Sequence, residues 1–371
     1  MRSELVSGGG GIRTLVRGLT PETVFETAAF NHSATPPGTS DEFGQEGSEG
    51  ARETPAMRVA YDRGLHELGD GLYCYLQPDG TWGWSNAGLI AAGGTSLLVD
   101  TLFDLDLTRA MLDAMRPITA KSPIDAAMNT HGNGDHCFGN ELLPDGAEIY
   151  ATAAAAAEMQ AAPPQLVNAL KHADVLGPDF SAYINRIFGP FRFEDIELRP
   201  PSSTFEGRLE LTIGDRAVHL VEVGPAHTDG DAIVHVPDAG VVFTGDILFV
   251  EGTPIVWAGP FSNWLGACDR LLELDAPTLV PGHGPVTDAS GVRDVKRYLT
   301  YVRDEARARF DAGMDAEQAA DDIDLSDFAG WGDPERIAVN VATASRELDP
   351  SLPEPQRPEL FVRMARWASR H

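Results

Sequence analysis

Three side chains that could bind a metal ion occur within six residues of one another. They are His131, Asp135 and His136, in the segment THGNGDH that starts at Thr130. Imidazole and carboxylate groups are ligands that zinc and iron accept, and a loop with glycines lets such side chains converge. Because residues of these types also cap helices or face solvent, this segment alone does not establish a metal site.

Three further residues of the same types follow later in the chain. His227 lies in GPAHTDG, Asp246 in TGD and His283 in PGHG, and each comes after an apolar run that predicts a β-strand. Each also lies close to a glycine. The ends of such strands can meet at one edge of the sheets, where sites commonly form. A purely structural interpretation would need several independent coincidences, so we interpret the set as one metal site.

The elements that must position these residues follow from the hydrophobic pattern. Two series of short strands, each accompanied by helices, predict a sandwich of sheets covered by helices. We predict strands at 71–76, 85–91, 95–100, 126–130, 209–213, 217–223, 232–236, 240–244 and 278–280. We predict helices at 105–115, 151–171 and 261–274 and from 292 onward, with an insertion or lid at 178–201.

In this order, the motifs resemble those of the metallo-β-lactamase-fold superfamily. The family has an Asp at the end of an early strand, then His-x-His-x-Asp-His, then His, Asp and His; here the early Asp is Asp100, and the match covers about residues 58–290. The resemblance implies an α/β fold, a four-layer αβ/βα sandwich with a helical C-terminal extension. It also implies a metal centre between the sheets that holds one or two ions, usually Zn²⁺ and sometimes iron or manganese.

The sequence departs from the family pattern at one position, where Asn133 replaces the second His. In the family scheme the first site would use His131, this missing His and His227. The second site would use Asp135, His136 and His283, with Asp246 bridging the two. A carboxamide is a poor zinc ligand beside imidazole. We therefore expect one firmly held ion, with the other weak, differently coordinated or absent; alternatively, Asn133 contacts only a ligand or the substrate.

The chemistry follows from the expected ion. A bound Zn²⁺ lowers the pKa of its water from about 15.7 to about 7. The catalytic carboxylates Asp135 or Asp246 could orient this water. Asp100 is expected behind the ligands, accepting a hydrogen bond from an imidazole or from loop amides; its alternative role is a turn cap at the strand end.

Aromatic residues near the motifs predict an apolar substrate pocket. Trp82 and Trp84 lie in the first predicted hairpin, and Phe249 and Trp257 closely follow Asp246. Such a wall suits an apolar or aromatic substrate, although ordinary core packing is the alternative. We see no cluster of basic residues near the motifs that would clamp a phosphate or coenzyme A.

Charge and composition narrow the function classes. The 371-residue chain has 28 Lys and Arg against 56 Asp and Glu, which gives a formal charge of −28. This charge argues against nucleic-acid and anionic-membrane partners. Only three cysteines occur, without a CxxC pattern, and the N-terminus has no apolar signal region, which together favour a cytoplasmic location.

Composition also suggests the domain organisation. Residues 1–56 are rich in Gly, Ser, Thr, Pro and Glu, which predicts a flexible tail. The motifs then require one metallo-β-lactamase-fold domain at 57–290. Residues 291–371 are expected to form a helical extension packed on the same domain.

The leading hypothesis is a zinc-dependent hydrolase that uses metal-activated water on a small, fairly apolar substrate. The bond could be an ester, thioester, lactone, amide or aryl halide. One alternative is a metal-dependent cyclase of an aromatic polyketide on the same fold, and a mono-iron oxygenase is another. A third is a non-catalytic binding protein with a decayed metal site. The expected partner is a small-molecule substrate, and a homo-oligomer is left open.

Overall fold

A seven-stranded β-sheet forms the N-terminal half of the structure. The computed structural model describes residues 59–173 and 177–371, so the predicted tail at 1–56 lies outside the described residues. The strands lie in chain order, antiparallel from β1 to β4 and parallel from β4 to β7. They are β1 (Gly64–Gly69), β2 (Leu72–Leu76), β3 (Ala87–Ala92), β4 (Thr95–Val99), β5 (Ile124–Met128), β6 (Glu148–Thr152) and β7 (Ser203–Phe205).

A five-stranded sheet packs against the first. Its order is β12-β11-β10-β9-β8, and only β11 and β12 are parallel among its described pairs. The strands are β8 (Arg208–Ile213), β9 (Arg216–Glu222), β10 (Ala232–Val236), β11 (Val241–Phe249) and β12 (Thr278–His283).

Strand β4 shows why the sheets and helices form layers. Leu97 and Val99 belong to the apolar cluster between the two sheets, where they join Val234 and Phe243 of the second sheet. The intervening Leu98 points to the opposite face and packs in a separate cluster with Met111 of helix α3 (Leu105–Thr119). An uninterrupted apolar run is therefore buried on both faces, as in other covered sheets. Full burial of such a side chain stabilises the fold by about 1.5–3 kcal/mol.

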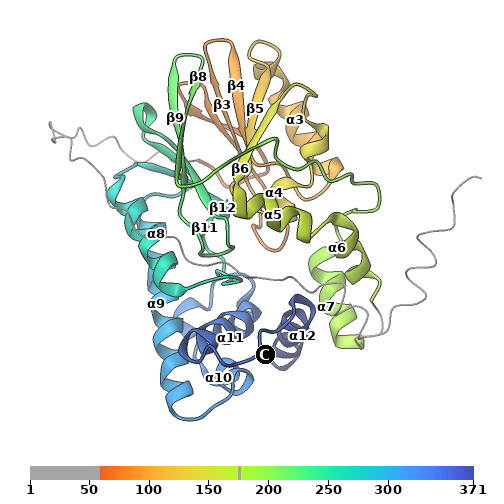
Figure 1. Ribbon diagram of the computed structural model, residues 1–371, viewed down its shortest axis with the longest axis vertical. Helices are drawn as coiled ribbons and strands as arrows, with labels where there is room; N and C mark the ends of the chain where they lie inside the picture. The colour runs from red at the N-terminus through yellow and green to blue at the C-terminus, as the bar shows by residue number, and fades with distance from the viewer. Residues whose placement is uncertain (1–58, 174–176) are drawn as a thin grey trace, which may run out of the picture.

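Helices cover the outer faces of both sheets (Figure 1). Helix α3 (Leu105–Thr119) covers the seven-stranded sheet, and its first turn is capped by Asp104, which accepts a hydrogen bond from the Leu107 amide at 2.8 Å. Helices α8 (Phe261–Glu273) and α9 (Ala289–Asp311) cover the five-stranded sheet. The predicted four-layer αβ/βα sandwich is confirmed.

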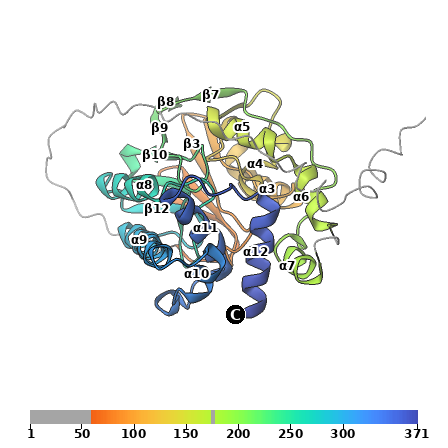
Figure 2. The same ribbon diagram turned by 60° about the horizontal axis from the view of Figure 1, so that its bottom comes forward.

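Further helices lie beyond the edge of the sandwich. They are the short α4 (Gly134–Cys137), α5 (Ala153–Ala161), α6 (Pro164–Lys171) and α7 (Pro178–Phe188), then α10 (Ala316–Asp322), α11 (Ile337–Leu348) and α12 (Arg357–Arg370). Figures 1 and 2 place α12 beside α7, and the two helices are in contact. Two segments far apart in sequence therefore meet below the sheets.

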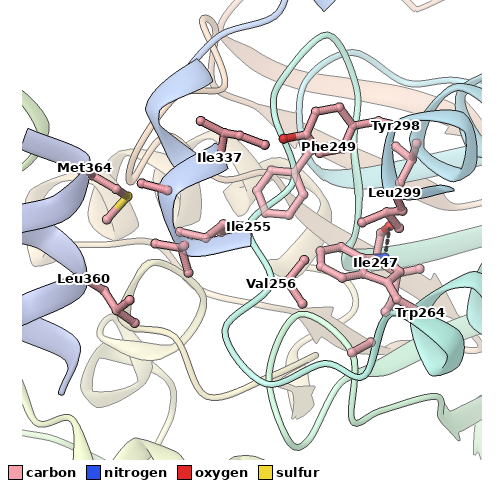
Figure 3. Packing of buried hydrophobic residues seen from close by; sticks show 14 of the residues in the cluster. Ile247, Phe249, Ile255, Val256, Trp264, Tyr298, Leu299, Ile337, Leu360 and Met364 are labelled. Atoms are coloured by element: carbon pink, nitrogen blue, oxygen red, sulfur yellow. Dashed lines mark hydrogen bonds between the residues drawn. The ribbon is translucent and has the colours of Figure 1, made fainter. Parts of the chain in front are cut away.

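The C-terminal helices share a core with strand β11 and the loop that follows it. Figure 3 shows Ile337 of α11 and Met364 of α12 on one side of Ile255, with Phe249 and Trp264 nearby. All five side chains are buried. The loop after β11 is therefore held between the sheet and the C-terminal helices.

The prediction of one helix at 151–171 is wrong. Strand β6 continues to Thr152, whose hydroxyl then caps α5 by accepting a hydrogen bond from the Ala155 amide. Pro163 and Pro164 separate α5 from α6, because proline lacks an N–H and disfavours helical geometry in the residue before it. Strand β1 had no counterpart among the predicted elements.

None of the described helices combines the length and the apolar character needed to cross a lipid bilayer.

Candidate metal centre

The six predicted ligands converge at one edge of the two sheets. His131, Asp135 and His136 come from the loop after β5 and from α4, and His227 comes from the loop before β10. Asp246 lies within β11, and His283 is the last residue of β12. Close chain approach requires glycine here, because a Cβ on Gly282 would lie 1.9 Å from Oδ1 of Asp246.

The ligand-type atoms form two groups. One consists of His131, His227 and Asp246, and the other of Asp135, His136 and His283; within each group the atoms lie within 4.8 Å of one another. Asp246 lies between the groups. Its Oδ2 is 3.3 Å from Nε2 of His227, and its Oδ1 is 3.2 Å from Nε2 of His136.

Neighbouring acceptors hold the imidazoles so that Nε2 points into the centre. Nδ1 of His227 donates to the Ile255 carbonyl at 2.7 Å, and Nδ1 of His283 donates to the Gly80 carbonyl at 3.0 Å. Nδ1 of His136 lies 2.9 Å from Oδ2 of Asp100. Partners of this kind orient rings for metal binding by fixing the tautomer.

Asp100 lies behind the cluster rather than in it. Besides its contact with His136, it accepts hydrogen bonds from the amide and the hydroxyl of Thr130, at 2.7 and 2.8 Å. The same hydroxyl lies 3.1 Å from Nδ1 of His131. Asp100 thus contacts the loop and one ring directly, and a second ring through Thr130.

The buried polar atoms fit a divalent cation. Among the described residues, Nε2 of His131, Nε2 of His136 and Oδ1 of Asp246 are buried without a hydrogen bond of normal geometry, although the last two lie 3.2 Å apart. Leaving such atoms unpaired is costly, and a cation that accepts their lone pairs would remove the cost. The donor set of imidazole and carboxylate suits zinc and iron.

The charges of the cluster are tuned by burial and by mutual contact. Burial opposes ionisation of Asp246, yet the imidazoles of His283, His136 and His131 hold its pKa well below the ordinary range. Burial lowers the pKa of His227 to about 4, against the opposing charge of Asp246. His227 is therefore neutral near pH 7, as a ligand must be.

Asn133 contacts the cluster, but through its nitrogen. Its Nδ2 lies 2.8 Å from Nε2 of His227. Because Nδ1 of His227 donates to the Ile255 carbonyl, Nε2 is the acceptor and Asn133 is the donor. The lone pair that His227 would offer an ion is thus engaged by Asn133. The equivalent nitrogens of the second group have no such amide partner among the described residues.

A cavity of about 560 Å³ opens onto the cluster, with Asn133, Asp135, His227, Asp246 and His283 in its wall. Of the predicted pocket residues, Trp82, Phe249 and Trp257 line it. The prediction for Trp84 is not met. Its ring packs 4.9 Å from Phe191 and under the guanidinium of Arg63, away from the residues that line the cavity.

The insertion at 178–201 reaches the cavity through Phe188. Other aromatic residues near the motifs serve the core. Trp264 is fully buried, and its indole N–H donates to the Ile247 carbonyl at 3.0 Å. Spacing alone could not separate such core residues from wall residues, because both kinds alternate in the same segment.

Four charged wall residues were missed by the sequence interpretation: Glu158, Asp229, Arg336 and Arg357. Glu158 is the only acidic residue in the alanine-rich α5, and Asp229 lies two residues after His227, which are weak signals. The two arginines lie far beyond the last motif, and nothing in the sequence pattern connects them to the site.

A family model described as the metallo-beta-lactamase superfamily matches residues 80–283, more than half of the chain. This segment contains all six candidate ligands. Among curated proteins, a probable metallo-hydrolase of Bacillus subtilis (strain 168) is 33% identical over 116 residues, 30% of this chain and 54% of the relative.

Two further relatives are named for their reactions. A hydroxyacylglutathione hydrolase of Brucella ovis is 34% identical over 98 residues, 26% of this chain and 37% of the relative. An acyl-coenzyme A thioesterase of Bos taurus is 29% identical over 99 residues, 25% of this chain and 34% of the relative. The chain thus matches about a third to a half of the length of these relatives.

Among solved structures, a stereoselective inverting sec-alkylsulfatase from Pseudomonas sp. superposes with a TM-score of 0.57 at 17% identity. The alignment covers 79% of this chain and 52% of the sulfatase. At this identity the likeness concerns the fold, and it extends past the segment that the family model matches. By its motifs, its family match and its architecture, this chain belongs to the metallo-beta-lactamase superfamily.

Proposed function

We propose that this protein is a zinc-dependent hydrolase that acts on a small, fairly apolar organic substrate. Asp135, His136, Asp246 and His283 are the proposed ligands of a firmly held ion. The proposal is carried by one observation, the convergence of buried, unpartnered ligand atoms at the wall of an aromatic cavity. The hydrolase names of the relatives reported above favour hydrolysis over the cyclase and oxygenase alternatives.

The ion would supply the nucleophile, because Zn²⁺ lowers the pKa of a bound water to about 7 and polarises the bond under attack. Asp135 is suited to accept a hydrogen bond from the attacking water, since its carboxylate is partly exposed and lines the cavity. Water adds to the electrophilic carbon, the bond to the leaving group breaks, and the water proton passes to the leaving group.

Asn133 supports unequal occupancy of the two ligand groups. Its amide engages Nε2 of His227, which leaves only His131 and the shared Asp246 uncommitted in the first group. Two protein ligands bind an ion weakly compared with three or four. We therefore propose one firm ion, with a second ion weak or absent.

The cavity supports an apolar substrate. Apolar side chains dominate the cavity wall, and the aromatic ones include Trp82, Phe103, Phe138, Phe249 and Trp257. A volume of about 560 Å³ is in the range of sites for small organic ligands. Esters, thioesters, lactones and aryl halides are the proposed candidates for the bond that is cleaved.

The test combines metal analysis with a substrate panel. We expect about one zinc per chain after mild purification, turnover of at least one of the four bond classes, and loss of that turnover on chelation with recovery on adding zinc. Protein that is folded but retains little metal and turns over none of the panel would contradict the proposal and favour a binding protein. Bound iron with oxygen consumption would instead favour the oxygenase.

A further inference from the structure

Two guanidinium groups from the C-terminal part of the chain line the cavity. They belong to Arg336, just before α11, and to Arg357, the first residue of α12. Both lie outside the segment that the family model matches. The rest of the wall is mainly apolar, both aromatic and aliphatic, with four acidic residues. Their partners differ, and this difference decides which of them is available to a substrate.

Arg336 is committed to the fold. Its Nη2 pairs with Oδ2 of Asp333 at 2.9 Å, and its Nη1 donates to the Thr253 carbonyl at 2.8 Å. The guanidinium also lies 4.5 Å from the ring centre of Trp82 and 5.1 Å from that of Phe249. Only 2% of the residue is exposed. Arg336 therefore anchors the segment before α11 to the cavity wall.

Within residues 59–173 and 177–371, Arg357 has no such polar partner. Its guanidinium lies 4.2 Å from the ring centre of Trp257, and it makes no hydrogen bond or ion pair with another described residue. The side chain is only partly buried. The group is thus held in place by cation–π contact, while its N–H donors have no acceptor among the described residues.

The charge of Arg357 survives in this setting. Burial lowers its pKa, and the nearby carboxylates of Glu158, Asp229 and Glu354 raise it. Since an arginine pKa lies far above neutral pH, the group stays cationic. Burial also raises the pKa of Glu158 to about 7, with a smaller contribution from Asp229, so Glu158 is partly neutral at physiological pH. Arg357 is therefore a cation beside three carboxyl groups, one of which, Glu158, is only partly ionised at neutral pH.

Arg357 lies at the same end of the cavity as the ligand cluster. The Trp257 amide donates to the His227 carbonyl at 3.0 Å, which fixes Trp257 beside that cluster. Burial is the main reason that the pKa of His227 is lowered, and the positive charge of Arg357 lowers it further. Phe361 of α12 stands 5.8 Å from the Trp257 ring and continues the aromatic wall.

We propose that Arg357 is a substrate-binding residue that recognises an anionic group, a carboxylate or a sulfonate, on an otherwise apolar substrate. The guanidinium fork matches the two oxygens of such a group, and the aromatic wall receives the apolar body. This assignment rests on the proposed function, since it specifies the substrate of the same cavity. The C-terminal helix α12 thereby takes part in substrate selection.

The test measures binding in the full-length protein with matched probes. 4-Phenylbutyrate carries the anion, 4-phenylbutanesulfonate replaces its carboxylate, and 4-phenylbutanamide is the neutral counterpart. Quenching of tryptophan fluorescence reports binding, because Trp82 and Trp257 line the cavity. Each titration is run on zinc-loaded and on chelator-treated protein, because a carboxylate can also bind an ion directly. We expect both anions to bind roughly tenfold or more tightly than the amide in the chelator-treated protein.

Variants identify the residue responsible. Arg357→Met keeps the aliphatic stem and removes the charge, so it should abolish the preference for anions while binding of the amide changes little. Arg357→Lys should retain part of the preference. Arg363→Gln, on the same helix but not in the cavity wall, is the matched control and should behave as wild type. The thermal unfolding midpoint shows whether each variant is folded.

Specific outcomes would overturn the inference. Equal affinity of folded wild-type protein for the anions and the amide would do so, as would an unchanged preference in Arg357→Met. These results are separable from failure of the hydrolase proposal, because binding is also measured on zinc-free protein and does not depend on turnover. An anion preference without any hydrolysis would sustain the role of Arg357 and contradict the hydrolase. Hydrolysis of neutral esters without any preference for anions in binding would support the hydrolase and contradict the role of Arg357.

Discussion

The two groups of ligand-type residues share Asp246 but have different surroundings. In the group of Asp135, His136 and His283, the rings are held from behind and their inner nitrogens have no amide partner among the described residues. In the group of His131 and His227, an amide from Asn133 occupies Nε2 of His227. One substituted residue thus affects two ligand positions, its own and that of the ring to which it donates.

This comparison teaches that counting ligand-type residues in the sequence overstates how many ligand atoms the first group can offer an ion. Six of the seven family positions are retained, yet the contact of Asn133 engages one of the six. We therefore expect the two groups to bind metal unequally. The second group, with Asp135, His136 and His283, should hold the retained ion, and the first group should contribute less to metal binding. The following predictions, from the largest expected effect to the smallest, would sharpen this asymmetry or remove it.

Replacing the shared residue should have the largest effect. In Asp246→Ala both groups lose the carboxylate that lies between them, so we expect no retained zinc and a fall in kcat/KM of about 10³-fold or more. Metal analysis and kinetics on the best substrate of the panel measure this. Asp145→Asn, an exposed acid, is the control. Normal zinc content in Asp246→Ala would show that Asp246 is not a ligand.

The two groups can be separated by a pair of alanine variants. His283→Ala should lose the firm ion and reduce activity by at least about 10²-fold, because a zinc site that loses one of its protein ligands holds the ion poorly. His131→Ala should keep most of the zinc. The ratio of zinc to protein in the two variants is the measurement. Equal loss in both would mean that the groups contribute equally, and the asymmetry would be wrong.

Asn133→His should change the number of ions rather than remove them. A ring at this position restores the missing ligand and releases Nε2 of His227, so zinc content should rise from about one toward two per chain. Asn133→Ala is the matched control, since it releases His227 without adding a ligand, and it should stay near one. If Asn133→His also stayed near one, the first group would be limited by something other than this residue.

The smallest effect concerns stability and arises at Glu158, another residue of the cavity wall. Burial raises the pKa of Glu158 from 4.5 to about 7. A raised folded-state pKa means that stability present at low pH is lost as pH rises, here between about pH 4.5 and 7. Glu158→Gln should remove this loss. We therefore compare the free energy of unfolding of Glu158→Gln with that of wild type at each pH. The variant's advantage over wild type should be larger at pH 8 than at pH 4.5 by on the order of 1–3 kcal/mol.

Urea unfolding of metal-free protein at several pH values measures the difference between the two curves. Glu197→Gln is a suitable control, because Glu197 is exposed and lies outside the cavity wall. A constant difference between wild type and Glu158→Gln across this range would show that Glu158 titrates normally. The Glu158 side chain would then carry a full negative charge near Arg357.

Much of the fold and of the candidate site could be predicted from sequence because its signals are local. The continuous apolar run that buries β4 on both faces is local, and so is the position of His227, Asp246 and His283 after or within apolar runs. Local signals failed where two elements compete for one segment. Ala151–Thr152 completes β6 because it pairs with β7, a long-range contact that outweighs the helical preference of the alanines that follow.

By itself, the sequence determined which groups could bind a metal and in what order, and that Asn133 departs from the pattern. It also determined that aromatic residues would accompany them. Tertiary structure alone decided that Asn133 donates to His227, that Trp82 faces the cavity while Trp84 packs on Phe191, and that Arg357 reaches the same wall. The physical reason is that hydrogen bonds and cation–π contacts act over a few ångströms of space. Residues 94 or 100 positions apart therefore interact only once the packed sheets and helices have brought them together.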